Sequence, residues 1–81
     1  MTPLDQLRIG QHAVIDSLDG EGPLLQRLLE MGLLEGEEIE VLGVAPLGDP
    51  IEIRIRDYRL SLRRREAACV GVTVLEGKGA P

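Results

Sequence analysis

The sequence of 81 residues is almost without aromatic side chains: Tyr58 is the single one, and there is no tryptophan or phenylalanine. Modules that stack ligands on aromatic rings, such as single-strand nucleic-acid platforms and polyproline-binding grooves, are therefore disfavoured. Basic residues are also in the minority, nine against fourteen acidic ones, which gives a net charge of −5. Because nucleic acid is bound through a basic field, we expect no nucleic-acid partner.

The sequence also lacks the features of secreted and membrane proteins. Its single cysteine, Cys69, allows no intramolecular disulfide. No apolar run approaches the roughly 18 residues that cross a bilayer, and the amino terminus lacks the basic start and apolar stretch of a secretory signal. We therefore expect a cytoplasmic protein without direct membrane insertion, which reaches the inner face of a membrane only through a partner.

Motifs for catalysis are missing as well. There is one histidine, no Ser-His-Asp arrangement that the sequence forces, and no G-x-x-x-x-G-K-[ST] phosphate loop. The short Gly20-Glu21-Gly22 segment offers too little backbone to cradle a nucleotide. We expect no enzymatic activity.

The chain does contain short segments in which apolar and polar residues alternate with the period of two of β-strands. These predict strands over residues 12–18, 38–42, 51–56, 58–62 and 69–74. The clearest is 51–56, where three isoleucines alternate with three charged residues. Residues 76–81 are polar and glycine-rich and predict a flexible tail after a single domain over residues 1–75.

One segment, residues 23–31, has the apolar spacing of an amphipathic helix instead. Pro23 suits the first helical turn, and Gly32 suits the left-handed residue after the last. Five short strands with one α-helix inserted after the first predict an all-β fold, a small β-barrel, because closing a sheet removes its exposed edges.

Three motifs occur in order along the chain: residues 27–36 with Met31-Gly32-Leu33 at their centre, residues 44–51, and residues 60–67. Together they resemble the ferrous iron transport protein A (FeoA) domain family over about residues 4–74. The resemblance implies an SH3-like barrel with a helix between the first two strands. It also implies an accessory or regulatory role beside FeoB, a membrane transporter of ferrous iron with a cytoplasmic GTPase domain.

Several residues of these motifs are expected to shape the backbone. Gly32 and Gly36 suit positive φ, one ending the helix and one turning into the next strand. Two prolines stiffen the loop that follows residue 44 and remove two donors. That loop is a tight connection between strands or, with Leu47 held toward solvent, a docking point. Its predicted structural residues are Pro46, Gly48, Asp49 and Pro50.

The candidate partner contacts form an apolar group and a basic group. The leucines of the helix either all pack on the barrel or leave part of their surface open for a partner. Three consecutive arginines cannot all share one face, and their forks suit carboxylates and phosphates, which favours an acidic partner surface. Internal pairing with Glu66, Glu52 or Asp57 is the alternative. The predicted contacts are Leu24, Leu25, Leu28, Met31, Leu33, Leu47, Arg63, Arg64 and Arg65.

His12 and Cys69 are the candidate metal ligands, because both are predicted to face outward on the neighbouring first and last strands. With a carboxylate they would suit weak binding of Fe²⁺ or another divalent transition metal. Two ligands are fewer than the four of a structural zinc site. The alternative is an exposed histidine beside a small cysteine, with no metal function.

The function expected from the resemblance is a small accessory protein of ferrous iron uptake. It would bind the cytoplasmic part of FeoB and modulate the GTPase or transport cycle by preferring one conformation of that partner. Two alternatives remain open: a metal-binding sensor or chaperone, and a self-associating module whose leucine face is buried in a homo-oligomer.

Overall fold

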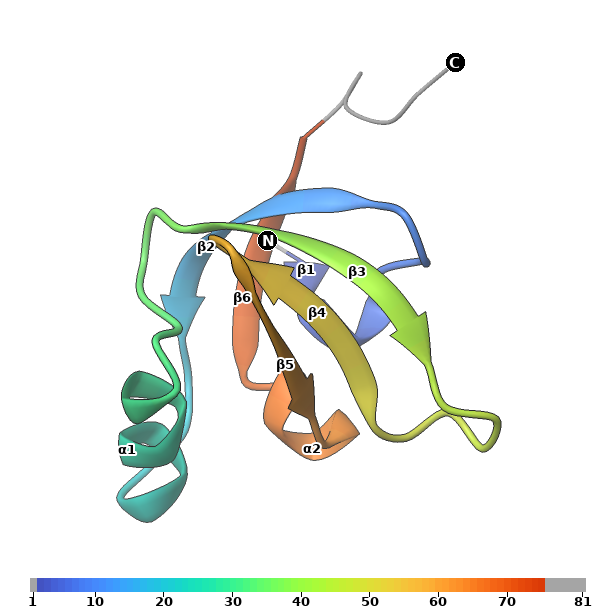
Figure 1. Ribbon diagram of the computed structural model, residues 1–81. Helices are drawn as coiled ribbons and strands as arrows, with labels where there is room; N and C mark the ends of the chain where they lie inside the picture. The colour runs from blue at the N-terminus through green and yellow to red at the C-terminus, as the bar shows by residue number, and fades with distance from the viewer. Residues whose placement is uncertain (1, 76–81) are drawn as a thin grey trace.

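The computed structural model describes residues 2–75, which form a six-stranded antiparallel sheet curled around an apolar core (Figure 1). The sheet order is β1-β6-β2-β3-β4-β5. The strands are β1 Thr2–Pro3, β2 His12–Leu18, β3 Glu38–Val44, β4 Ile51–Ile55, β5 Tyr58–Leu62 and β6 Val70–Val74. A 3₁₀ helix, η1 Leu4–Gln6, and two α-helices, α1 Pro23–Glu30 and α2 Arg64–Ala67, complete the fold. The predicted tail over residues 76–81 lies outside the described residues.

The predicted all-β fold with a helix after the first long strand is confirmed, but three short elements escaped prediction. These are β1, η1 and α2, the longest of which has four residues. Strands β1 and β5 are the two edges of the sheet. Helices η1 and α2, which follow these edge strands in the chain, pack against each other and so close the barrel. No helix within residues 2–75 is long and apolar enough to cross a membrane.

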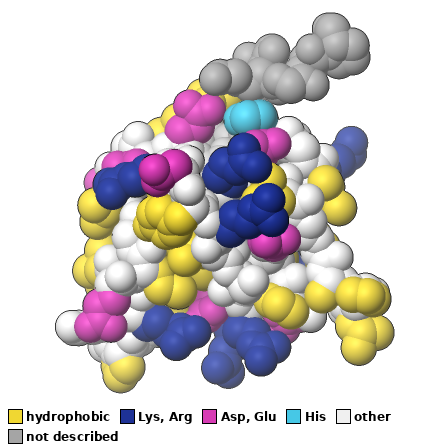
Figure 2. All heavy atoms as spheres, viewed as in Figure 1, with side chains coloured by type: hydrophobic (Ala, Val, Ile, Leu, Met, Phe, Trp, Pro, Cys, Tyr) yellow, Lys and Arg dark blue, Asp and Glu magenta, His cyan; other side chains and the backbone are white. Residues whose placement is uncertain are grey.

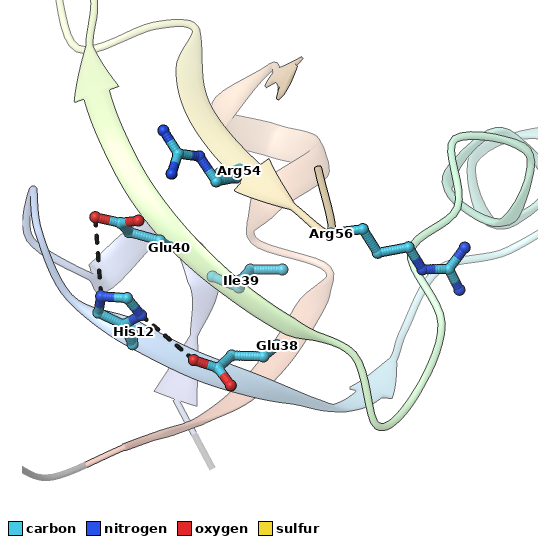
Figure 3. A pocket seen from close by; sticks show the side chains of 6 residues that line it. All are labelled: His12, Glu38, Ile39, Glu40, Arg54 and Arg56. Atoms are coloured by element: carbon cyan, nitrogen blue, oxygen red, sulfur yellow. Dashed lines mark ion pairs between the residues drawn. The ribbon is translucent and has the colours of Figure 1, made fainter. Parts of the chain in front are cut away.

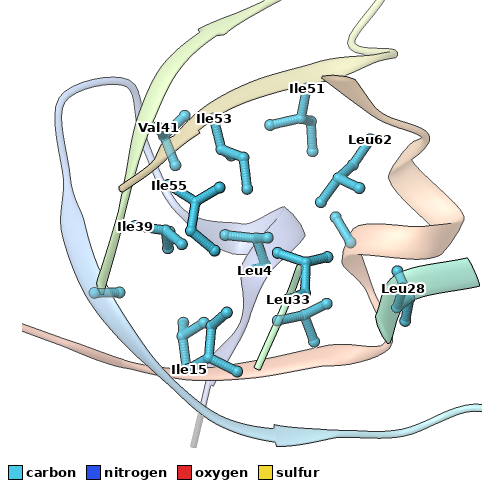
Figure 4. Close-up of a cluster of buried hydrophobic side chains, with 14 residues drawn as sticks. Leu4, Ile15, Leu28, Leu33, Ile39, Val41, Ile51, Ile53, Ile55 and Leu62 are labelled. Carbon is cyan, nitrogen blue, oxygen red and sulfur yellow. The ribbon is translucent and has the colours of Figure 1, made fainter. Parts of the chain in front are cut away.

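The core follows from the alternation in the strands, because their apolar residues point to the inside of the curled sheet (Figure 4). Register shifts in β2, between Ile15 and Ser17, and in β3, between Val41 and Gly43, bend these strands and increase their twist. The buried apolar residues are Leu4, Ala13, Ile15, Leu28, Leu33, Ile39, Val41, Ile51, Ile53, Ile55, Leu62, Ala67, Val70 and Val72.

Leu28 and Leu33 belong to this core, so the prediction that they contact a partner is wrong. Both side chains are fully buried. Leu28 is the only buried residue of α1, and Leu33 follows the helix in the loop that leads to β3. The pair therefore fastens the carboxyl-terminal half of α1 to the end of the barrel.

Gly32 has a second reason to be glycine besides its backbone angle. Its φ of +93° confirms the predicted left-handed residue after α1. The hydroxyl of Tyr58 donates a hydrogen bond to the Met31 carbonyl at 3.0 Å. A Cβ atom at position 32 would clash with that hydroxyl. The only aromatic residue of the chain thus clamps the end of α1 onto the start of β5.

We expect Gly32→Ala to lower the free energy of unfolding by about 2 kcal/mol, because it strains the backbone and displaces Tyr58 from its hydrogen bond. Gly36→Ala is the matched control, since its φ of +92° is nearly the same but a Cβ there meets open space. The control should lose only about 1 kcal/mol in urea unfolding. Equal losses in the two variants would contradict the clamp.

Candidate functional site

A groove between α1 and α2 is the most distinctive surface feature at the end of the barrel that carries the two helices. We call it the arginine groove; it is lined by Pro23, Leu24, Arg27, Arg63, Arg65 and Glu66. Figure 2 shows basic side chains gathered at the lower edge of the molecule, where Figure 1 places the helices. The structure thus joins part of the predicted leucine face to part of the predicted arginine cluster.

Glu66 forms the floor of the arginine groove and links its two helices. Its side chain is buried, and its Oε1 accepts a hydrogen bond from the Arg63 backbone N–H at 2.8 Å. This reach back to the residue before the helix satisfies a donor that α2 cannot satisfy itself. Its Oε2 accepts a hydrogen bond from Arg27 Nε, on α1, at 2.6 Å. The buried carboxylate is therefore neutralised by a residue that sequence analysis did not single out.

Arg64 is held by the protein itself rather than presented to a partner. Its Nη1 donates to the Gly48 carbonyl at 2.9 Å and its Nη2 to the Asp5 carbonyl at 3.4 Å. Its backbone N–H donates to Asp49 Oδ1 at 2.9 Å. These bonds fasten the β3–β4 loop to α2, which supports the structural role predicted for that loop. They also correct the predicted partner contact at Arg64, because main-chain carbonyls already occupy its guanidinium group.

Arg63 and Arg65 differ from Arg64 because no carbonyl or carboxylate among residues 2–75 holds their guanidinium groups. Both residues are exposed, and both also border a smaller hollow on the side of Asp49. None of the three guanidinium groups pairs with Glu66, Glu52 or Asp57, and only that of Arg64 is bonded internally, to two main-chain carbonyls. Two unpaired cations remain at the rim of the groove.

The remaining apolar candidates lie on both sides of α2. Leu24, Leu25 and Met31 are half-buried, and Leu24 forms part of the groove wall. Leu47, in the β3–β4 loop, is 97% exposed, which confirms that this loop holds it toward solvent. Figure 1 places α1 and the β3–β4 loop on opposite sides of α2. Leu47 therefore lies outside the groove but at the same end of the barrel.

His12 and Cys69 are far apart, so the prediction that they share a metal site is wrong. His12 begins β2, while the Cys69 carbonyl is bonded to Asp19, just after the other end of this seven-residue strand. At about 3.3 Å per residue, roughly 20 Å separate the two. Although β2 and β6 are neighbours as predicted, the two residues sit at opposite ends of the pair.

His12 is instead placed between two carboxylates on the outer face of the sheet (Figure 3). Its Nδ1 lies 3.4 Å from Glu38 Oε2 and its Nε2 3.8 Å from Glu40 Oε2. The carboxylates face different ring nitrogens, so they cannot join one nitrogen in holding a single ion. Within residues 2–75, no three histidine, cysteine or acidic side chains are grouped to hold a metal.

A second ion pair ties the loop before β3 to the turn between β4 and β5. Arg56 donates to both carboxylate oxygens of Glu37, at 3.0 and 2.7 Å. These hydrogen bonds hold the pKa of Glu37 below its ordinary value and raise the pKa of Arg56. The stability from this pair is present at neutral pH and is lost as the pH falls through the lowered pKa of Glu37. The pair has a structural role outside the arginine groove.

Comparison with known proteins relates the whole described domain to one family. The family model described as the FeoA domain matches residues 2–74. A curated relative from Porphyromonas gingivalis, a fusion of Fe(2+) transport protein A with the Fe(2+) transporter FeoB, is 44% identical over 72 residues. The match covers 89% of this chain but 8% of that relative, so the chain spans less than a tenth of the relative's length.

Solved structures show the same fold. A FeoA-like protein from Clostridium acetobutylicum has a TM-score of 0.85 at 37% identity, covering 93% of this chain and 91% of its own. The FeoA of Stenotrophomonas maltophilia, solved in complex with zinc and described as a prokaryotic SH3 domain protein, has a TM-score of 0.79 at 28% identity. That match covers 90% of this chain and 91% of the other. The predicted SH3-like barrel is confirmed.

Proposed function

This chain belongs to the FeoA domain family, and we propose that it is a small accessory protein of ferrous iron uptake. It binds the cytoplasmic part of a FeoB-type transporter and modulates the GTPase or transport cycle of that partner. The observation that carries the proposal is the relative in which such a domain and FeoB form one chain. Fusion holds two domains at a high effective concentration, which favours their working together.

We assign the contact to the end of the barrel that carries α1 and α2. This surface offers what protein interfaces use: apolar side chains that are only partly covered, and arginines with free donors. Leu28 and Leu33 are left out because they are buried, and Arg64 because it holds the β3–β4 loop. The proposed contacts are Leu24, Leu25, Met31, Leu47, Arg63 and Arg65.

The protein would act by stabilising one state of the transporter rather than by chemistry of its own. A ligand shifts an equilibrium only as far as its affinities for the two states differ. A tenfold preference for one state corresponds to about 1.4 kcal/mol. Contact on the cytoplasmic face places the domain beside the GTPase, where such a preference changes the rate of nucleotide turnover.

Titration of the ¹⁵N-labelled protein with the isolated cytoplasmic domain of a FeoB-type transporter tests this function. We expect amide shifts to cluster at residues 23–31, 45–49 and 63–65. Leu25→Asp should weaken binding about tenfold or more, because it puts a charge into an apolar contact. Ile9→Asp is the matched control, since Ile9 is exposed in the loop between η1 and β2, outside the proposed surface.

Two results would count against the proposal in different ways. Absence of shifts at millimolar concentrations of the cytoplasmic domain would contradict binding. Saturable binding that leaves the GTP hydrolysis rate and the transport rate unchanged would contradict modulation while keeping the docking role.

A further inference from the structure

We infer that the arginine groove binds an acidic segment of a partner protein. The segment places carboxylates on Arg63 and Arg65 and an aliphatic side chain against Pro23 and Leu24. The inference rests on the proposed function for the identity of the protein that carries the segment, but the chemistry of the segment follows from the groove itself.

The first support is the charge of the groove. Three arginines and one glutamate line it, in a protein whose net charge is −5. Glu66 is buried, and each of its oxygens already accepts a hydrogen bond, from Arg27 Nε or from the Arg63 backbone N–H. The guanidinium groups of Arg63 and Arg65 have no acidic partner among the described residues. The groove is therefore a local positive site that attracts anionic side chains.

The second support is the way in which Arg27 is held. Its Nε is bonded to Glu66, no bond within residues 2–75 holds its two terminal nitrogens, and the side chain lines the groove and is 60% exposed. A guanidinium group fixed in this way loses little rotamer freedom when a carboxylate binds. Glu66 thus orients one of the three cations in advance of binding.

The third support is the apolar wall, which favours a peptide over a free phosphate or nucleotide. Pro23 and Leu24 line the same groove as the arginines. A phosphate group would pair with the arginines and leave this wall in water. A segment with acidic and aliphatic residues covers both kinds of surface at once.

The surroundings of the groove extend the same pattern. Arg64 pins the β3–β4 loop to α2, and this loop, which carries the exposed Leu47, lies on the other side of α2 from α1 (Figure 1). An extended segment that crosses α2 would thus meet apolar side chains on both sides of the cations. The segment expected from this order is acidic at its centre and aliphatic at its ends.

The test uses the peptide acetyl-Leu-Glu-Glu-Glu-Leu-amide, its counterpart with lysine in place of glutamate, and pyrophosphate, each titrated into the ¹⁵N-labelled protein. We expect the acidic peptide to shift the amides of residues 23–27 and 63–66, and the lysine peptide to leave them in place. The double variant Arg63→Glu/Arg65→Glu should bind the acidic peptide at least about tenfold more weakly. Arg54→Glu/Arg59→Glu makes the same change of net charge on exposed positions of β4 and β5 and should bind like the wild type.

Three outcomes would overturn the inference. One is that the acidic peptide shifts no groove amides. Another is that the two double variants weaken binding of the acidic peptide equally, which would mean that net charge alone determines the affinity. The third is groove binding by pyrophosphate but not by the acidic peptide. Urea unfolding of both double variants establishes that they are folded.

A second titration separates this inference from the proposed function. If the FeoB-type cytoplasmic domain binds Arg63→Glu/Arg65→Glu as tightly as the wild type, the groove inference fails and the proposed function stands. If the acidic peptide binds the groove but the cytoplasmic domain does not bind the protein, the proposed function fails and the groove stands as a site for another acidic partner.

Discussion

Replacing Leu28 by alanine should lower the free energy of unfolding by about 3 kcal/mol. Leu28 is fully buried and is the only core residue that α1 supplies. Its loss leaves a cavity between the helix and the barrel that the rigid sheet cannot fill. In a domain of this size the melting temperature should fall by roughly 15 °C.

Leu29→Ala is the matched control, because Leu29 is the next residue of the helix and is 44% exposed. It should cost less than about 0.5 kcal/mol. Urea denaturation of the two variants, with amide exchange of α1, measures the difference. Similar losses would mean that α1 does not rest on Leu28 in solution, and Leu28 would return to the candidate partner contacts.

Replacing Glu66 by alanine should lower the free energy of unfolding by about 2–3 kcal/mol. The variant loses the hydrogen bond that begins α2 and the charge-assisted hydrogen bond to Arg27. The hydrogen bond to Arg27 should contribute to this loss only at the low end of the range for charge-assisted hydrogen bonds. The Arg27 side chain is 60% exposed, so water screens its charge. Glu66→Gln keeps one acceptor oxygen, enough for the Arg63 backbone N–H or for Arg27 Nε but not for both, and should recover about half of the loss.

A double-mutant cycle with Arg27→Ala isolates the link between the helices. The two changes should be non-additive by about 1 kcal/mol, because each already removes the same hydrogen bond. Glu35→Ala, at an exposed position before β3, is the control and should be additive with Arg27→Ala. Additive losses for the pair Arg27 and Glu66 would contradict their coupling in solution.

The regular part of the fold could be predicted from the sequence because each element carries its own period. Alternation located the five longer strands, of which 12–18 and 58–62 have the predicted bounds, while β3 runs two residues further, β4 ends one residue earlier and β6 begins one residue later. The helix followed from its leucine spacing and the flanking Pro23 and Gly32. A two-residue strand and a four-residue helix contain too few positions to show any period.

The site was only partly predictable because its decisive contacts join distant parts of the chain. Leu24 and Leu28 are one helical turn apart on the same face, yet only Leu28 is fully buried, since the barrel end lies under one half of the helix. Arg27 and Glu66 are separated by 39 residues, and no local pattern pairs them. The position of Glu66 three residues after Arg63 was the one signal for the start of α2.

The pairing of β1 with β6 has a consequence for how this domain can be joined to other proteins. Thr2 lies opposite Val72, so the first and last strands of the described domain are neighbours. Strand β6 ends on the side of the barrel away from α1 and α2 (Figure 1). The attachment of a neighbouring domain there would leave the arginine groove open. The tether would then raise the local concentration of any site on that neighbour that binds the groove. The architecture thus permits covalent fusion and free docking to use the same surface.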